Sequence, residues 1–307
     1  MKNEPGDNNC PACDSKDFIS LNIDVPDYEY RISYTPDLIF CKGCNLIRHE
    51  TLPGYNKLGE FYPDDYLVYN KSFNAASNAL YSKLKNKLYD IRAKKLTKLI
   101  GPKGNILDVG CANGAFLLSL KRLGDYGLYG LDIKNTGMNF AEHAIDFKEG
   151  HLEDLYYPEH FFNAVILDNV LEHVPDPVIF MHKVMFILKP GGYIFGTTPN
   201  YNSIDRFVFK KYWGGFHMPR HIYLFNANNL NMFMKKMGTS EVTFPLTANA
   251  ADWAVSFQNF MRRKQEKQGT YKRASYFPLV AIALFPVALL SSLFNLNGVM
   301  DFVCVRR

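Results

Sequence analysis

The feature that most constrains this chain is an apolar run that ends in a glycine-rich turn. The run reads Ile106-Leu-Asp-Val-Gly110-Cys-Ala-Asn-Gly114, and helically spaced apolar residues follow over 115–123. Glycines let a backbone approach a ligand closely, and a helix start offers free N–H groups. The G-x-x-x-G spacing is neither the dinucleotide fingerprint nor a phosphate-binding loop with Gly-Lys-Ser/Thr. We therefore expect a strand, a tight turn and a helix that bind another nucleotide-type ligand.

Strand-like and helix-like segments alternate after residue 104. The expected strands are 105–109, 127–133, 164–168, 193–197, 241–246 and 300–305, and the expected helices are 115–123, 136–144, 177–188 and 228–237. An amphipathic helix with a basic face is expected before them, over 76–100. Apolar strands without polar alternation, each followed by a helix, indicate a parallel sheet covered on both faces. The fold class is therefore α/β.

Four of the six cysteines form two C-x-x-C pairs near the start of the chain. Cys10 and Cys13 are separated by 27 residues from Cys41 and Cys44. This pattern suits a tetrahedral Zn²⁺ held by four thiolates, a structural rather than a catalytic site. Short β-like stretches between the pairs, over 18–23, 31–34 and 38–40, indicate a small zinc ribbon. Asp14 and Asn45, directly after each pair, tolerate left-handed backbone.

Composition and the chain start narrow the classes of function. With 47% hydrophobic and 21% charged residues, the chain is not largely disordered. A net charge of +5 is too mild to favour nucleic acid as a partner. The start MKNEPGDNN has no apolar signal core, so we expect a cytoplasmic protein. We expect a zinc ribbon over 1–50, a linker and helix over 51–100, and the main domain over 101–307.

The stretch 108–114 resembles motif I of class I S-adenosylmethionine-dependent methyltransferases. The resemblance continues in the family's order through Asp132, residues 162–177 and Leu188-Lys-Pro-Gly-Gly192. It implies a Rossmann-like seven-stranded methyltransferase sheet with S-adenosylmethionine as the methyl donor. A zinc ribbon before such a domain is similar to bacterial sugar and cell-surface polysaccharide methyltransferases.

The resemblance also implies roles for individual residues. Asp108 would orient the methionine amino group, and Asp132 would bind the ribose hydroxyls. Gly110 and Gly114 would shape the loop beneath them, and the backbone at Leu152 would contact adenine. Before Leu152, the sequence departs from the family pattern, because His151 stands where an aspartate is usual.

Residues 211–225 follow the expected strand 193–197 and combine two histidines, an arginine and several rings. Loops at the carboxyl ends of strands line the site in such folds. His217 or His221 is expected to be the general base, since histidine titrates near neutral pH. Arg220 would pair with an anionic acceptor group and Trp213 would stack on the acceptor. The alternative is that these residues only tie the loop to the domain.

Glu172 and His173 offer another set of candidates near the methyl donor. His173 is a third candidate base. Some ubiquinone-type O-methyltransferases, which share the Leu-Glu-His-Val-Pro-Asp-Pro stretch, hold a divalent metal nearby. Here Asn169 stands where a first acidic ligand would fall, which weakens that interpretation.

A basic stretch and an apolar stretch precede the last expected strand. Residues 262–273 carry six basic residues and one acidic residue, and no charge appears over 274–300. The apolar run is short for a membrane span and contains Pro278 and Pro286. Three interpretations stay open. Residues 262–294 contact the inner face of the cytoplasmic membrane, or residues 274–299 form an insertion that packs between the last two strands, or the segment is a homodimer contact.

The sequence thus predicts methyl transfer to a hydroxyl of a small-molecule sugar or a lipid-linked sugar, in cell-surface polysaccharide synthesis. Three alternatives stay open. They are a quinone-type lipid O-methyltransferase, an RNA methyltransferase with a continuous basic surface, and a cofactor-binding scaffold without turnover.

Overall fold

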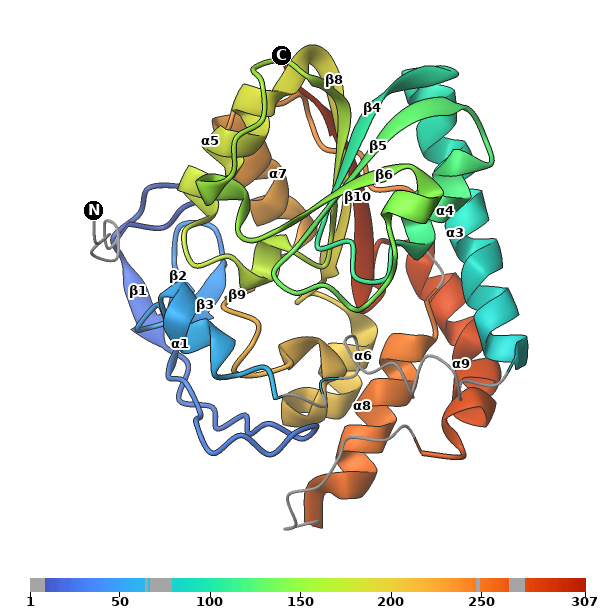
Figure 1. Ribbon diagram of the computed structural model, residues 1–307. Coiled ribbons are helices and arrows are strands. Elements are labelled where there is room, and N and C mark those ends of the chain that lie inside the picture. The colour runs from blue at the N-terminus through green and yellow to red at the C-terminus, as the bar shows by residue number, and fades with distance from the viewer. Residues whose placement is uncertain (1–8, 64–65, 67–78, 247–248, 265–273) are drawn as a thin grey trace.

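A six-stranded mixed sheet forms the centre of the computed structural model, which describes residues 9–63, 66, 79–246, 249–264 and 274–307 (Figure 1). The strand order is β10-β8-β7-β4-β5-β6. The strands are β4 (Lys103–Val109), β5 (Asp125–Asp132), β6 (Ile145–Glu149), β7 (Phe162–Asp168), β8 (Leu188–Pro199) and β10 (Val299–Val305). Five run parallel, and β10 pairs antiparallel with β8.

Helices cover both faces of this sheet, as the apolar strands predict (Figure 1). The main helices are α3 (Ala79–Ile100), α4 (Ala115–Lys121), α5 (Pro177–Ile187) and α7 (Ala227–Lys236). Side chains of a strand point alternately to opposite faces. In β4, Ile106 packs with α3 and α4, whereas Leu107 joins the core that includes α5 and α7. The α/β class is confirmed.

The expectation of seven strands is wrong for the described residues, which contain six in this sheet. The segment expected as a strand over 241–246 makes one isolated bridge to β10, Thr243 with Val303, and Thr239 before it makes another with Arg306. A continuous ladder does not form, because Ser240 rather than Glu241 lies opposite Val305, whose N–H donates to the Ser240 hydroxyl, and because Pro245 has no N–H.

Two further expected elements differ in the structure. Residues 136–144 form only a short 3₁₀ turn, η1 (Ala141–His143), rather than a helix. Gly137 has a φ of 82°, and its N–H donates to the side chain of Asn135, so the chain makes a turn where helix was expected. The stretch 31–34 is not a strand, because Arg31 has a φ of 59°.

A second sheet combines three strands of the cysteine-rich N-terminal module with one strand from the distant residues 211–225. Its order is β1 (Phe18–Ser20), β2 (Leu38–Cys41), β3 (Ile47–His49) and β9 (Tyr223–Leu224), all antiparallel. The short helix α1 (Tyr55–Gly59) follows β3 in the chain. The module is therefore joined to the segment after β8 by backbone hydrogen bonds.

Three helices form a separate layer at the bottom of Figure 1. They are α6 (Ile204–Phe209), α8 (Ala251–Met261) and α9 (Phe277–Ser292), with the 3₁₀ turns η4 (Lys210–Tyr212), η5 (Gly214–Phe216) and η6 (Arg262–Lys264). Trp253 of α8 and Ala288 of α9 form the buried centre of this layer. Among the described residues, no helix has the length and apolar content needed to cross a bilayer.

Candidate functional site

The glycine-rich turn lies between β4 and α4 and has the backbone that the sequence predicts. Gly110 and Gly114 have φ values of 73° and 67°, a left-handed region that other residues rarely adopt. A Cβ atom on Gly114 would lie 2.7 Å from a ring carbon of Phe140. The N–H of Gly110 donates to the carbonyl of Leu131 at 2.7 Å, which fixes the turn against β5. Larger side chains are therefore excluded on both conformational and steric grounds.

Three carboxylates meet at the carboxyl edge of the parallel strands. Asp108, Asp132 and Asp168 lie on β4, β5 and β7. An Asp132 oxygen accepts a hydrogen bond of 2.8 Å from the N–H of Ala112, within the glycine-rich turn. Burial, with the nearby charge of Asp168, raises the pKa of Asp108 well above its usual range. This edge is therefore electrostatically suited to a cationic group.

Arg92 of α3 is a residue that the sequence analysis missed. Its guanidinium makes two hydrogen bonds of 2.6 Å to the two carboxylate oxygens of Asp168. From the sequence we expect an amphipathic helix here, with its basic residues on the solvated face. However, Arg92 shares the spacing i, i+3, i+4, i+7 with Tyr89, Ala93 and Leu96, and this signal places it on the buried face.

The segment expected to contact adenine forms the 3₁₀ turn η2 (Leu152–Asp154) after β6. Leu152 is buried, and its side chain belongs to the core. The ring of His151 stacks on Tyr55, with ring centroids 3.8 Å apart. The hydroxyl of Tyr55 in turn donates to Glu153 at 2.5 Å. The histidine that replaces the usual aspartate is thus held by a residue of α1.

The three histidines expected as bases come together in one cluster. The ring centroid of His173 lies 4.6 Å from that of His221 and 6.4 Å from that of His217. The rings of His217 and His221 are 4.9 Å apart. His173 follows β7, whereas the other two lie just before β9, so the sequence separation hides this proximity. The hydroxyl of Tyr62 is 2.9 Å from Nδ1 of His173.

The hydrogen bonds distinguish these histidines. Nε2 of His217 accepts from Nε of Arg220 at 2.8 Å, and its Nδ1 lies 3.1 Å from a Glu29 oxygen. Because the guanidinium can only donate, the lone pair of His217 is already used. Nδ1 of His221 donates to the carbonyl of Gly215 at 2.8 Å, which leaves its Nε2 as an acceptor. Burial lowers the pKa of His221 well below its usual value, so the ring is neutral.

Glu172 stands beside these rings and is fully buried. One carboxylate oxygen accepts from the hydroxyl of Thr198 at 3.0 Å, whereas the other has no hydrogen-bond partner. Burial raises the pKa of Glu172 to about 8. Ligand atoms of Glu172, His173 and His221 all lie within 4.8 Å of one another. This set could hold a divalent cation, with two neutral imidazoles and one carboxylate.

Two residues expected to touch the acceptor make structural contacts instead. The guanidinium of Arg220 has 0% exposure and makes two hydrogen bonds of 3.0 Å to Asp27, in the N-terminal module. Trp213 is also buried, and its indole N–H donates to Asp205 at 2.9 Å. These contacts match the alternative in which the segment is tied to the domain, and they give no support to substrate contacts by either residue.

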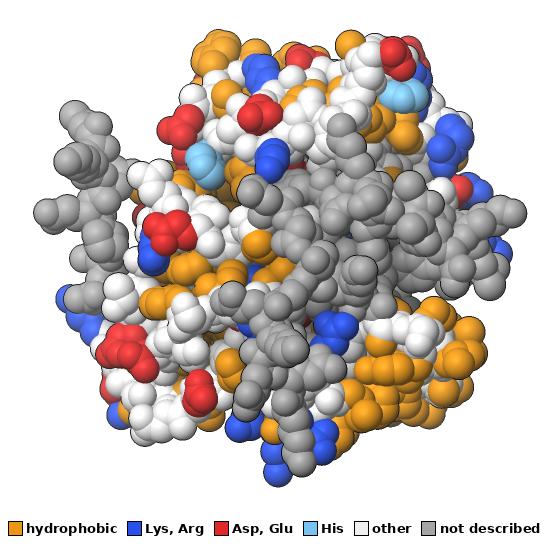
Figure 2. All heavy atoms as spheres, turned by 60° about the horizontal axis from the view of Figure 1, so that its bottom comes forward, with side chains coloured by type: hydrophobic (Ala, Val, Ile, Leu, Met, Phe, Trp, Pro, Cys, Tyr) orange, Lys and Arg blue, Asp and Glu red, His pale blue; other side chains and the backbone are white. Residues whose placement is uncertain are grey.

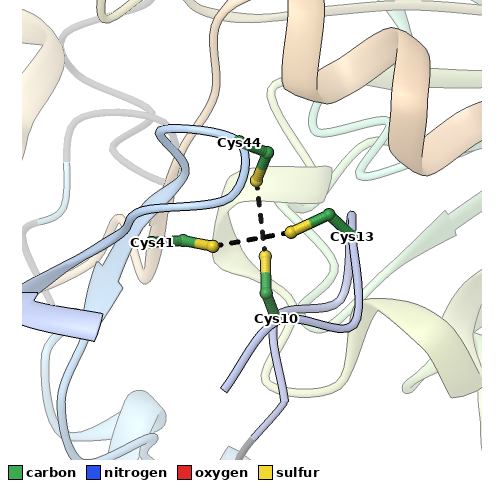
Figure 3. A group of neighbouring side chains, drawn as sticks. All are labelled: Cys10, Cys13, Cys41 and Cys44. Carbon is green, nitrogen blue, oxygen red and sulfur yellow. Dashed lines mark hydrogen bonds between the residues drawn. The ribbon is translucent and has the colours of Figure 1, made fainter. Parts of the chain in front are cut away.

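Cys10, Cys13, Cys41 and Cys44 point toward a common centre (Figure 3). The sulfurs of Cys10 and Cys44 are 3.5 Å apart, as are those of Cys13 and Cys41. Tetrahedral Zn²⁺ with bonds of about 2.3 Å needs sulfurs about 3.8 Å apart, so the cluster is compatible with zinc. Asp14 and Asn45 have φ values of 61° and 65°, which confirms the expected left-handed positions.

Comparisons with known proteins agree with this geometry. The ubiquinone biosynthesis O-methyltransferase of Neisseria meningitidis serogroup C is 31% identical over 128 residues, which are 38% of this chain and 54% of that protein. The mitochondrial ubiquinone biosynthesis O-methyltransferase of Dictyostelium discoideum is 35% identical over 113 residues, 31% of this chain and 35% of that protein. The chain thus spans about half the length, or less, of these curated relatives.

Solved structures and a family also match. A SAM-dependent methyltransferase from Archaeoglobus fulgidus aligns with a TM-score of 0.47 and 16% identity, over 72% of this chain and 94% of that one. The sequence model of a family described as a methyltransferase domain matches residues 81–242. This match covers more than half of the chain and confirms the expected enzyme class: the chain belongs to the methyltransferase domain family.

Proposed function

We propose that the chain transfers a methyl group from S-adenosylmethionine to a hydroxyl of a quinone-type lipid precursor. The observation that carries this proposal is the neutral His221, whose Nε2 is oriented as an acceptor in a buried cluster with residues that directly follow β7. Methylation of a hydroxyl needs such a base, because the attacking oxygen must lose its proton.

The donor half of the proposal uses the carboxyl edge of β4 and β5. Asp108 and Asp132 would hold the amino group and the ribose hydroxyls, and Gly110 and Gly114 would leave room for the ligand. The fit is electrostatic as well as steric, because a bound cation would offset the cost of keeping the buried Asp108 carboxylate charged. S-adenosylmethionine supplies an electrophilic methyl carbon, whose transfer leaves a neutral thioether.

The acceptor half uses the histidine cluster. His221 would take the hydroxyl proton on Nε2, while its Nδ1–H stays on the carbonyl of Gly215 and keeps the ring oriented. His217 is less suited, since Arg220 already donates to its lone pair. Burial lowers the pKa of His173 to about 3 and also lowers that of His221, so the pKa does not separate these two rings. Nε2 of His221 lies 4.0 Å from a carboxylate oxygen of Glu172, which would stabilise the ring once it has taken the proton. Among the three candidates, His221 is therefore our choice.

The names of the relatives support this class of acceptor. Those compared above are named ubiquinone biosynthesis O-methyltransferases, and this favours the quinone-type alternative over the sugar or glycan hydroxyl that we expected first. The stretch around Glu172 also resembles that of ubiquinone-type O-methyltransferases. We therefore propose a phenolic hydroxyl as the methyl acceptor in preference to a sugar hydroxyl. A phenolic hydroxyl also ionises more readily than a sugar hydroxyl.

Titration with S-adenosylhomocysteine tests the donor half. Calorimetry should show binding to the zinc-loaded full chain and to Asp125→Asn, and loss of binding in Asp132→Asn. The two aspartates lie at opposite ends of β5, so Asp125→Asn is a matched control for the loss of one charge. No binding to the unchanged chain would overturn the proposal.

Turnover tests the acceptor half. Methyl transfer to a prenylated catechol should exceed transfer to a nucleotide sugar. His221→Gln should lose turnover but keep affinity for S-adenosylhomocysteine, and His182→Gln, an exposed position on α5, should keep both. Faster methylation of the nucleotide sugar would favour the sugar acceptor that we expected first. Full turnover of His221→Gln would show that His221 is not the general base.

Zn²⁺ in the cysteine cluster is part of the same proposal. The four thiolates complete the coordination, so the metal would stabilise the fold of the N-terminal module rather than act on substrate. Metal analysis should find one Zn²⁺ per chain, and Cys41→Ser should lose it. Cys304→Ser, a buried cysteine on β10, is the matched control and should retain the metal.

A further inference from the structure

Helix α9 presents an apolar face that no described part of the chain covers. Leu279 and Ile282 are 70% and 69% exposed. We define the apolar patch as the exposed side chains Leu279, Ile282, Phe285, Leu289, Leu290 and Leu293. Figure 2 shows a continuous hydrophobic surface at its lower right, where this helix lies. An exposed patch of this size on one helix indicates an interaction surface.

The patch is a consequence of how α9 packs. Ala288 is buried against the layer that contains Trp253 of α8, and Tyr276 contacts Phe257 at the other end. The remaining circumference is apolar too, because no charged residue occurs over 274–300. A helix that is apolar on nearly all sides normally has a second apolar neighbour.

Basic side chains border the patch at the end where α8 stops and α9 begins. Lys210, Lys211 and Arg263 are exposed. The turn that holds the two lysines packs on the end of α8, with Tyr212 5.5 Å from Phe260, and Arg263 lies over the same Phe260 ring. Figure 2 shows basic side chains next to the hydrophobic surface. We call these three residues the basic rim.

We propose that the apolar patch and basic rim seat the protein on an anionic lipid surface, with α9 lying in the plane of the interface. At about 1.5 Å per residue, the 16 residues of α9 span about 24 Å, short of the roughly 30 Å hydrocarbon core. Apolar side chains would enter the acyl boundary while lysine and arginine meet the headgroups.

Charge complementarity favours lipid over a second copy of the chain. A second copy facing the patch would offer apolar contacts but few acids for the rim, since Asp252 is the one acidic residue in the described parts of α8 and α9. Anionic headgroups supply that missing charge. This docking does not depend on methyl transfer, although a lipid acceptor would be reached at the same surface.

Vesicle co-sedimentation of the full chain, without methyl donor, tests the proposal. The protein should bind vesicles of phosphatidylcholine mixed with phosphatidylglycerol more strongly than vesicles of phosphatidylcholine alone. Ile282→Ser should weaken binding about tenfold, the factor expected for burying one such side chain. Lys211→Gln should weaken binding about fivefold, and only to the anionic vesicles.

Ile179→Ser is the matched control, because Ile179 is exposed on α5, at the opposite end of the molecule (Figure 1). It should bind vesicles as the unchanged chain does. Absence of vesicle binding, or equal effects of Ile179→Ser and Ile282→Ser, would overturn the proposal. So would a dimer, seen by analytical ultracentrifugation, that Ile282→Ser disperses while vesicle binding is unchanged. Binding of S-adenosylhomocysteine, measured separately, reports on the methyltransferase function alone.

Discussion

Replacing Asp27 with asparagine should destabilise the protein strongly, because it leaves the buried guanidinium of Arg220 without its hydrogen-bonded carboxylate. The two side chains are 1% and 0% exposed and share two hydrogen bonds of 3.0 Å. Asp27 also accepts from the backbone N–H groups of Glu29 and Tyr30, at 2.9 Å and 3.1 Å. Asparagine keeps the size and one acceptor oxygen but loses the charge.

Removing one partner of a buried ion pair costs about 3–5 kcal/mol of unfolding free energy. We expect Asp27→Asn to lose this amount in urea unfolding at neutral pH. Tryptophan fluorescence is a suitable probe, since Trp213 is buried in the same segment as Arg220. In Asp27→Asn/Arg220→Met the buried cation of this pair is gone as well, so the loss should be smaller than in Asp27→Asn alone.

The pH dependence gives an independent check. Burial raises the pKa of Asp27, but the charge and hydrogen bonds of Arg220, together with the backbone N–H groups of Tyr30 and Glu29, outweigh it, so the pKa in the folded protein lies below its usual value. The stabilisation is then present above about pH 4 and is lost as pH falls through the folded pKa. The difference between the unchanged chain and Asp27→Asn should shrink in acid.

Asp90→Asn, which breaks an exposed pair with Arg122, is the control and should cost less than about 1 kcal/mol. The reasoning is refuted if Asp27→Asn costs no more than this control. It is also refuted if the double variant is less stable than Asp27→Asn.

Three shorter predictions follow from the site. Gly114→Ala should lower the free energy of unfolding by about 1–2 kcal/mol, because alanine disfavours the left-handed backbone at this position. It should also weaken the binding of S-adenosylhomocysteine in calorimetry, and unchanged affinity would contradict this. The unfolding free energy of the unchanged chain minus that of Glu172→Gln should fall as pH rises from about 5 to about 8, since Glu172 keeps its proton longer in the folded state. The histidines with lowered pKa act in both chains, so they cancel in this difference, and a difference that does not change with pH in urea unfolding would contradict the assignment. Trp213→Phe should cost about 1–3 kcal/mol in urea unfolding, because the buried Asp205 loses its donor; a stability equal to that of the unchanged chain would argue against this role.

The donor side of the site could be predicted because it depends on local sequence. The strand, the glycine-rich turn and the helix are consecutive, and Asp132 ends the next strand, so parallel pairing alone brings it to the turn. The backbone requirements at Gly110 and Gly114 are also local. For the same reason the C-x-x-C pairs indicated a common metal site, and the structure brings all four sulfurs together.

The acceptor side could not be predicted in the same way, because it depends on pairings between distant segments. Nothing near Arg220 in the sequence points to Asp27 as its partner, so an exposed role was the natural expectation. The missing seventh strand has a similar cause. The apolar pattern over 241–246 suits a strand, but the N–H of Val305 donates to the side chain of Ser240, and Pro245 has no N–H to donate to β10.

The pairing of β3 with β9 has a consequence for synthesis of the chain. Ile47 and Leu224 are partners in this sheet, although nearly 180 residues lie between them. At 5–20 residues per second, the ribosome needs roughly 10 to 35 s to make that interval. During this time the cysteine-rich module has an open strand edge and Asp27 has no Arg220. Early binding of Zn²⁺ would protect the nascent module until the later segment arrives, so metal supply should affect the yield of folded protein more than its final activity.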